Sequence, residues 1–212
     1  YGTNNDKSHF SLAPNFQTRQ FQFALGNATH SGSISLSDQR TMGMSSVIGT
    51  EDDSTAKQNV SAQYQLQLSS DFRLNTIFTK DYFSSEYDDS FPALLDADNH
   101  FTSKSQRVVV QPKWIGESSS FVGRVSWATS SRDFVSSFPV YFEGDVMDVE
   151  GVFSTKFNTQ LMGLIGLNHK QQEAQFSDKV SVDLTDYFLN LLYETNGFFE
   201  VQAGTRLSEH ST

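Results

Sequence analysis

The sequence predicts one all-β domain over residues 1–212, an antiparallel transmembrane β-barrel of about ten strands. Three observations predict it: apolar and polar residues alternate with a period of two, connections alternate in length, and aromatic residues gather at strand ends. Helical periodicity does not appear at length, and no apolar run is long enough for a transmembrane helix.

The composition excludes several classes of protein. Aromatic residues make up 13% of the chain, which argues against disorder. The absence of cysteine rules out a disulfide framework, a thiolate nucleophile and a cysteine-based zinc site within this sequence. A net charge of −10 opposes binding to the phosphate backbone, so we expect no nucleic-acid partner.

The alternation is clearest over residues 60–68, where Val, Ala, Tyr and two Leu share one face and Ser and three Gln share the other. A strand separates these residues onto two faces, whereas a helix would scatter them. Comparable stripes predict further strands around residues 21–25, 34–36, 72–78, 108–114, 121–127, 149–157, 161–167, 187–193 and 199–203.

The expected connections are short at one end of the strands and long at the other, which is typical of bacterial outer-membrane barrels. Short turns are expected near residues 26–29, 69–71, 116–118, 158–159 and 194–197. Long polar loops are expected near residues 41–57, 84–104, 130–146 and 171–179.

Aromatic residues near the short turns predict a girdle at one membrane interface, where amphipathic rings are enriched. Its members are Phe72, Trp114, Phe121, Phe157, Tyr193, Phe198 and Phe199. A second girdle is expected at the loop side, formed by Tyr82, Phe83, Trp127 and Phe176.

The polar strand faces are the main candidate for function, because they would line the lumen. The expected pore-lining residues are Gln63, Gln65, Gln67, Arg124, Glu150, Lys156, Glu200, Gln202 and Arg206. They carry both signs of charge, so strong ion selectivity is not expected. Ten closed strands would leave a crowded or very narrow lumen.

A soluble β-sandwich or β-solenoid would also alternate. A sandwich, however, fills one shared core with apolar faces, whereas nearly every strand here also has a polar face with long Gln, Arg or Glu side chains. Such a face suits a wet lumen.

Four segments resemble the barrel of TonB-dependent outer-membrane transporters, the group of vitamin B12 and siderophore receptors. Residues 198–211 are similar to a mid-barrel strand with an aromatic pair, a run of small residues, Arg, an acidic residue and His-Ser. The other segments are Thr18–Gly26, Asp52-Asp53 and Ser90-Phe91-Pro92. The resemblance implies the bacterial outer membrane and contact with a lipid bilayer or detergent.

The chain departs from that family in lacking a recognisable plug domain. Its start, Tyr1 to Phe16, resembles the continuation that the family shows after the His210-Ser211 strand. We therefore expect a circularly permuted or truncated barrel, in which the two ends together form one strand and give ten in all.

No catalytic constellation occurs, so the chain is not expected to be an enzyme. The five histidines have no metal-ligand spacing, and no metal site or cofactor is expected. The acidic stretches 51–53, 86–89 and 96–98 leave loop calcium open, although none has EF-hand spacing.

The expected function is a narrow pore or a passive scaffold in the outer membrane. Two alternatives stay open. One is a segment of an active transporter barrel that needs further strands and a plug. The other is a binding module whose loops recognise a small ligand at the cell surface.

Overall fold

The computed structural model describes residues 2–4, 16–42, 53–89, 95–195 and 199–211, and all its regular elements are strands. Among these residues, no helix is long and apolar enough to cross a membrane. The strands are β1 (Gly2–Asn4), β2 (Phe16–Gly26), β3 (His30–Met42), β4 (Ser54–Gln67), β5 (Phe72–Asp89), β6 (Leu95–Ile115), β7 (Ser119–Val135), β8 (Val140–Lys156), β9 (Leu161–Gln175), β10 (Lys179–Thr195) and β11 (Phe199–Ser211).

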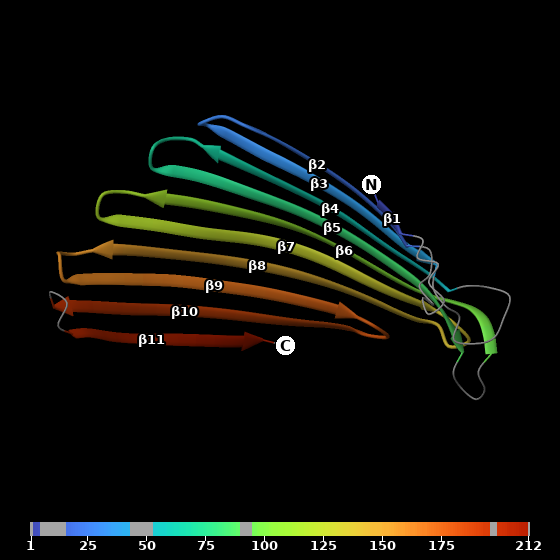
Figure 1. Ribbon diagram of the computed structural model, residues 1–212. Helices are drawn as coiled ribbons and strands as arrows, with labels where there is room; N and C mark the ends of the chain where they lie inside the picture. The colour runs from blue at the N-terminus through green and yellow to red at the C-terminus, as the bar shows by residue number, and fades with distance from the viewer. Residues whose placement is uncertain (1, 5–15, 43–52, 90–94, 196–198, 212) are drawn as a thin grey trace.

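The strands form a single antiparallel sheet in chain order, from β1 at one edge to β11 at the other (Figure 1). Each strand pairs with the next one along the chain, so the pairing needs only local reversals of direction. This confirms the all-β antiparallel fold, with ten long strands and the three-residue β1.

The register gives the sheet one apolar and one polar face. Val110, Val125 and Val149 follow one another across β6, β7 and β8 on the apolar face. Large side chains on this face are open to the surroundings: Val125 is 46% exposed and Ile165 is 58% exposed. Among the described residues, Val109 is the one buried apolar side chain of the core. A sandwich would cover such a face with a second sheet, and the described strands form one layer.

Among the described residues, short turns join β2 to β3, β4 to β5, β6 to β7 and β8 to β9 at one end of the sheet (Figure 1). In the first turn, the Asn27 side-chain oxygen accepts hydrogen bonds from the backbone N–H groups of Thr29 and His30, both at 2.8 Å. Asn158 does the same for Gln160 and Leu161, also at 2.8 Å. Because asparagine binds its own backbone in this way, it favours a tight reversal.

The expected long loops are largely strand. The range 130–146 holds the end of β7 and the start of β8, with residues 136–139 between them, and 171–179 leaves only residues 176–178 between β9 and β10. The ranges 84–104 and 41–57 are likewise partly strand, in β5, β6, β3 and β4. The predicted loop boundaries were wrong because the strands continue after their apolar stripe ends.

The two ends of the chain do not combine into one strand. β1 pairs with β2, and β11 lies at the opposite edge beside β10. The sheet of described residues is therefore open, and the expected closure of ten strands around a narrow lumen does not form.

Candidate functional site

Polar side chains follow one another across the middle of the polar face, and we call this row the polar belt. On β4, β5 and β6 it consists of Gln65, Asn75 and Gln111, which are cross-strand neighbours. The Asn75 amide donates a hydrogen bond of 3.0 Å to the Gln111 side chain, and Gln63 donates one of 3.3 Å to Asn75. Amide groups thus link three strands on this face.

On β7 to β11 the belt becomes charged. Its members are Arg124, Glu150, Asn168, Asp186 and Ser208, each the cross-strand partner of the next. The Arg124 guanidinium lies 3.0 Å from a carboxylate oxygen of Asp148 and 3.5 Å from one of Glu150. One cation therefore balances two carboxylates of β8.

Asp186 is the most buried member of the belt, with 1% of its surface exposed. Arg206 and Ser208 of β11 both donate hydrogen bonds to its carboxylate. A buried carboxylate needs such partners, because burial without them costs several kcal/mol, on the order of the desolvation penalty of an ion. Asp186 thereby fastens the edge strand β11 to the sheet.

The structure places all nine residues predicted to line the lumen on the polar face. The three glutamines lie on β4 and face the same side as Asn75. Arg124 and Glu150 are cross-strand partners, and Lys156 follows Glu150 by an even number of residues on β8. Glu200, Gln202 and Arg206 alternate along β11 opposite Glu194, Leu192 and Phe188. That they line a passage stays a prediction.

The predicted girdle at the short turns lies on the apolar face. Phe72, Trp114 and Phe121 are cross-strand neighbours on three successive strands. Phe157 lies just after β8, next to Gly163, and Tyr193 and Phe199 lie near the ends of β10 and β11. Phe198 lies outside the described residues.

The second predicted girdle was wrong in part, because two members lie on the opposite face from the other two. Tyr82 and Trp127 occupy the apolar face, but Phe83 pairs with Lys57 on the polar face. Phe176 stacks on Phe142, with ring centroids 4.7 Å apart, also on the polar face.

The two faces exchange character near the loop end of the strands. There the formerly apolar face carries Lys104, Glu143 and Glu173. A hydrogen bond and the charge of Glu173 raise the pKa of Lys179, which forms a 2.8 Å ion pair with it. The strands thus have a charged outer surface beyond their apolar band.

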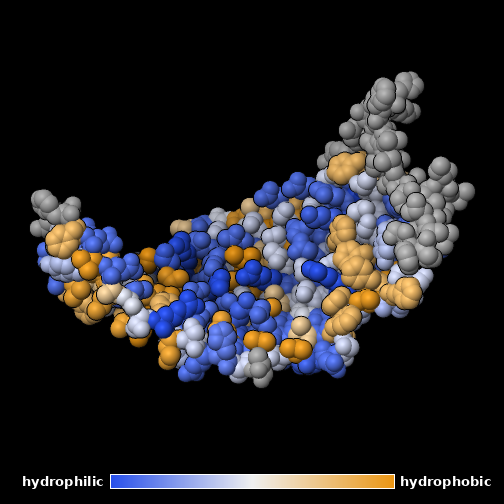
Figure 2. Space-filling model, turned by 90° about the horizontal axis from the view of Figure 1, so that it is seen from below, coloured by the Kyte–Doolittle hydropathy of each residue, from blue (hydrophilic) through white to orange (hydrophobic). Residues whose placement is uncertain are grey.

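The polar face at this end carries an aromatic cluster, which we define as Phe83, Phe101 and Phe134. Their ring centroids are 5.8 Å apart for Phe83 and Phe101 and 4.6 Å apart for Phe101 and Phe134. This cluster was not predicted, because residues 84–104 and 130–146 resemble loops in the sequence. The period-two alternation contained the signal, because each ring of the cluster is separated by an even number of residues from polar-face residues of its own strand. Figure 2 shows hydrophobic side chains at the surface both at the short-turn end, at the left, and near the loop end, at the right.

The acidic stretches provide no metal centre among the residues that the structure describes. Glu86 instead accepts a hydrogen bond of 2.7 Å from the backbone N–H of Ser54. Glu51 and Asp52 lie outside the described residues. His30 contacts the Tyr64 hydroxyl at 2.6 Å, and His169 contacts the Thr185 hydroxyl at 2.9 Å.

Solved structures with the same fold come from the bacterial outer membrane. The outer membrane transporter YddB from Escherichia coli matches 93% of this chain and 34% of its own, with a TM-score of 0.72 and 9% identity. The ferric enterobactin receptor PfeA from Pseudomonas aeruginosa matches 98% of this chain and 38% of its own, with a TM-score of 0.68 and 8% identity. No family model and no curated protein matches the sequence.

These comparisons confirm the predicted fold, that of the barrel portion of outer-membrane transporters. The chain spans about a third of the length of the two transporters that it matches. Both similar proteins are named as a transporter or a receptor, and neither as an enzyme.

Proposed function

We propose that this chain forms a sector of the wall of a large transport barrel in the bacterial outer membrane. The polar belt faces the lumen, the apolar face contacts lipid, and the chain carries out no catalysis. The observation that carries the proposal is an open meander sheet with an exposed apolar face, of the fold found in outer-membrane transporters.

The height of the apolar band supports the membrane assignment. On β8 the apolar face carries no charged residue from Phe157 to Met147, and Asp145 follows. The ten steps between these eleven residues span about 33 Å at roughly 3.3 Å each. A tilt of about 40° reduces this to roughly 25 Å, the height of the apolar band of outer-membrane barrels.

The open edges favour a sector over a closed narrow pore. β11 is exposed along all of its length, and within the part of the chain that the structure describes it pairs on one side only, with β10. Unpaired backbone groups at lipid depth cost several kcal/mol each, on the order of a lost hydrogen bond, so the sheet edge must pair with further strands. A narrow pore of ten strands, and a passive scaffold of that size, both require a closure that this sheet lacks.

Alternating chemical accessibility tests this proposal. The chain contains no cysteine, so single cysteines can be introduced at Val125, Ser126, Trp127 and Ala128 of β7 in the complete gene product. In outer-membrane vesicles, the odd positions are expected to face lipid and to resist a water-soluble maleimide, because the reactive thiolate does not form in apolar surroundings. Water and any plug should be in contact with the even positions instead. Labelling without alternation, or recovery of folded protein without detergent, would refute the wall assignment.

A second candidate function is recognition of an aromatic, anionic ligand at the mouth of the barrel. The aromatic cluster provides stacking surfaces, and Lys57 and Arg132 lie on the same face, in the cross-strand row of Phe83. Aromatic rings with adjacent cations bind such ligands by stacking and charge attraction.

Ferric enterobactin, named for one of the two similar structures, is the first probe for this candidate. Replacing Phe101 and Phe134 with alanine is expected to weaken binding to cells at least about tenfold, the equivalent of roughly 1.4 kcal/mol. Phe142→Ala, which leaves the cluster intact, provides the control. If all forms bind equally, or none binds, ferric enterobactin is not the ligand of this cluster.

A further inference from the structure

Cationic side chains gather on the polar face of β4, β5 and β6. Between the level of Phe83 and the short turns, the described side chains of this face include one carboxylate, that of Asp81, which accepts a hydrogen bond of 2.7 Å from Asn59. They also include four cations: Lys57, Arg73, Arg107 and Lys113. This part of the face is therefore positive, although the whole chain has a net charge of −10. None of the four is among the nine predicted lumen residues, so the expectation of weak ion selectivity does not extend to these strands.

Two of the cations lie directly opposite each other. Arg73 and Lys113 are cross-strand partners on β5 and β6, and like charges in this arrangement weaken a sheet by repulsion. Among the described residues, neither forms an ion pair. The carboxylate of Asp71, in the adjoining turn, accepts a hydrogen bond of 2.5 Å from Ser70 instead. The two cations are therefore available to an anion that is not part of the described chain.

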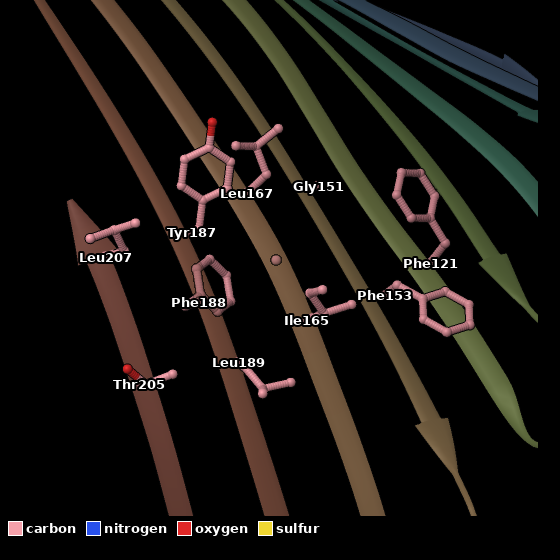
Figure 3. A pocket seen from close by; sticks show the side chains of 11 residues that line it. Phe121, Gly151, Phe153, Ile165, Leu167, Tyr187, Phe188, Leu189, Thr205 and Leu207 are labelled. Atoms are coloured by element: carbon pink, nitrogen blue, oxygen red, sulfur yellow. The ribbon is translucent and has the colours of Figure 1, made fainter. Parts of the chain in front are cut away.

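The pair lies at the short-turn end of the polar face. Its sequence neighbours Phe72 and Trp114 belong to the aromatic girdle on the opposite face. Figure 3 shows part of that face, with Phe121, the cross-strand partner of Trp114, among other uncharged side chains. Because such a girdle marks a membrane interface and short turns face the periplasm, Arg73 and Lys113 lie where the lumen opens toward the periplasm.

The other cations connect this pair with the mouth of the barrel. Arg107 is exposed and lies six residues from Lys113 along β6, a distance of about 20 Å. Four residues further, about 13 Å, is Ser103, the cross-strand partner of Arg132 in the row that also contains Lys57. An anion on this wall therefore stays within about 10 Å of a cation, roughly the range over which salt leaves charges unscreened.

We infer that Arg73 and Lys113 form a binding site for an oxyanion, the phosphate or carboxylate group of a solute that leaves the lumen on the side of the short turns. The inference rests on the proposed function, because it requires the polar face to border the lumen. Arginine binds such groups through two parallel N–H donors, and lysine adds a compact charge with further donors. An oxyanion between the two side chains also offsets their mutual repulsion.

Charged thiol reagents test the inference in the complete gene product, purified in detergent. The chain contains no cysteine, so Gln65→Cys places a single thiol on the polar face, diagonal to Arg73. At low salt, a negatively charged sulfonatoethyl methanethiosulfonate should react at least about fivefold faster than the positively charged trimethylammonioethyl reagent, after correction for their rates with free cysteine. Inorganic phosphate should slow the negative reagent more than chloride of equal ionic strength does.

Matched variants assign the effect to the two cations. The double variant Arg73→Gln, Lys113→Gln should bring the two rates within about twofold and abolish the effect of phosphate. Lys113→Gln alone should reduce the preference, and it replaces the double variant if that protein does not fold. Lys80→Gln is the control, because it removes a lysine of β5 from the opposite face. A thiol introduced by Gln202→Cys, where the polar face carries both signs of charge, should show no preference.

The outcomes separate this inference from the proposed function. Equal rates of both reagents at the Gln65→Cys thiol, or a preference that the double variant retains, contradict the oxyanion site alone. Phosphate that protects no better than chloride also contradicts it. A thiol that reacts with neither reagent does so too, because another segment of protein then covers the cations. Loss of the alternation between odd and even positions of β7 contradicts the proposed function itself.

Discussion

At the scale of single residues, the polar face is held together by a few specific contacts. Asp186 is buried and receives hydrogen bonds from two side chains of β11, whereas most belt residues stay partly exposed. Hydrogen bonds to a charged group contribute about 1.5–3 kcal/mol each, more than those between neutral groups. The attachment of β11 should therefore depend strongly on this one carboxylate.

Replacing Asp186 with asparagine should lower the free energy of unfolding by about 1.5–3 kcal/mol. The amide keeps the shape but leaves the Arg206 guanidinium without its counter-charge. Urea unfolding in detergent, followed by the heat-dependent mobility of the folded form on gels, measures the change. Glu200→Gln, an exposed change on the same strand, should stay within roughly 0.5 kcal/mol. Equal stabilities of both variants would contradict this role of Asp186.

Gly166 is required by the ring that covers it. A Cβ atom there would overlap the Phe188 ring, whose cross-strand partner on the polar face is Arg206. Gly166→Ala should cost about 1–3 kcal/mol, the usual range for overpacking. The double variant with Phe188→Ala should cost less than the sum of the single changes. Gly144→Ala, with contacts of 3.4 Å and longer, is the control for the loss of a strand glycine.

At the scale of elements, β8 shows three zones along its apolar face. From the short turns upward, the apolar face first carries aromatic residues, then aliphatic ones, and finally charged ones beyond Met147 on β8. The exchange of character between faces near the loop end indicates where the strands leave the membrane. Strands of 15 to 21 residues from β5 to β10 exceed the roughly 9–11 that cross a bilayer.

Two adjacent positions on β10 test the assignment of the faces. Leu189 lies on the apolar face and is 45% exposed, whereas Asn190 lies on the polar face. Leu189→Arg should destabilise the folded protein in lipid by about 2–4 kcal/mol, the cost of arginine near the bilayer midplane. Asn190→Arg should cost clearly less, because its charge stays hydrated. Unfolding titrations in phospholipid vesicles provide the comparison, and equal costs would show that the faces are assigned wrongly.

At the scale of the whole molecule, the open sheet determines what the chain can do. A strand edge at membrane depth is stable only when another strand pairs with it. The transporters of the same fold are about three times as long as the matched part of this chain. Barrels of 22 strands enclose a plugged lumen, whereas about ten strands would leave little space. In the proposed function, transport therefore belongs to the assembled barrel rather than to this sector alone.

Hydrogen exchange tests whether β11 is paired on both sides in the complete gene product. In an antiparallel pair, alternate residues direct their N–H groups away from the neighbour. If another strand follows β11, all its amides should be protected as strongly as those of β7, which pairs with both β6 and β8. Rapid exchange at every second residue of β11 would instead show a free edge.

The sequence by itself determined the strands, their two faces and the side of each predicted lumen residue. Period-two alternation follows directly from strand geometry, so Gln63, Arg124 and Gln202 could be assigned to a face before the register was known. The positions of the short turns were also predictable, because Asn27 and Asn158 form local hydrogen bonds that do not depend on distant contacts.

Only the tertiary structure decided the rest. The extent of the strands beyond the membrane depends on cross-strand pairing, so polar residues near 130–146 resembled loops in the sequence. The Asp186–Arg206 contact, the aromatic cluster and the Arg73–Lys113 pair each join residues of different strands, whose relative register the sequence does not state. Whether the sheet closes depends on what pairs with its edges, a long-range property that periodicity within one strand cannot encode.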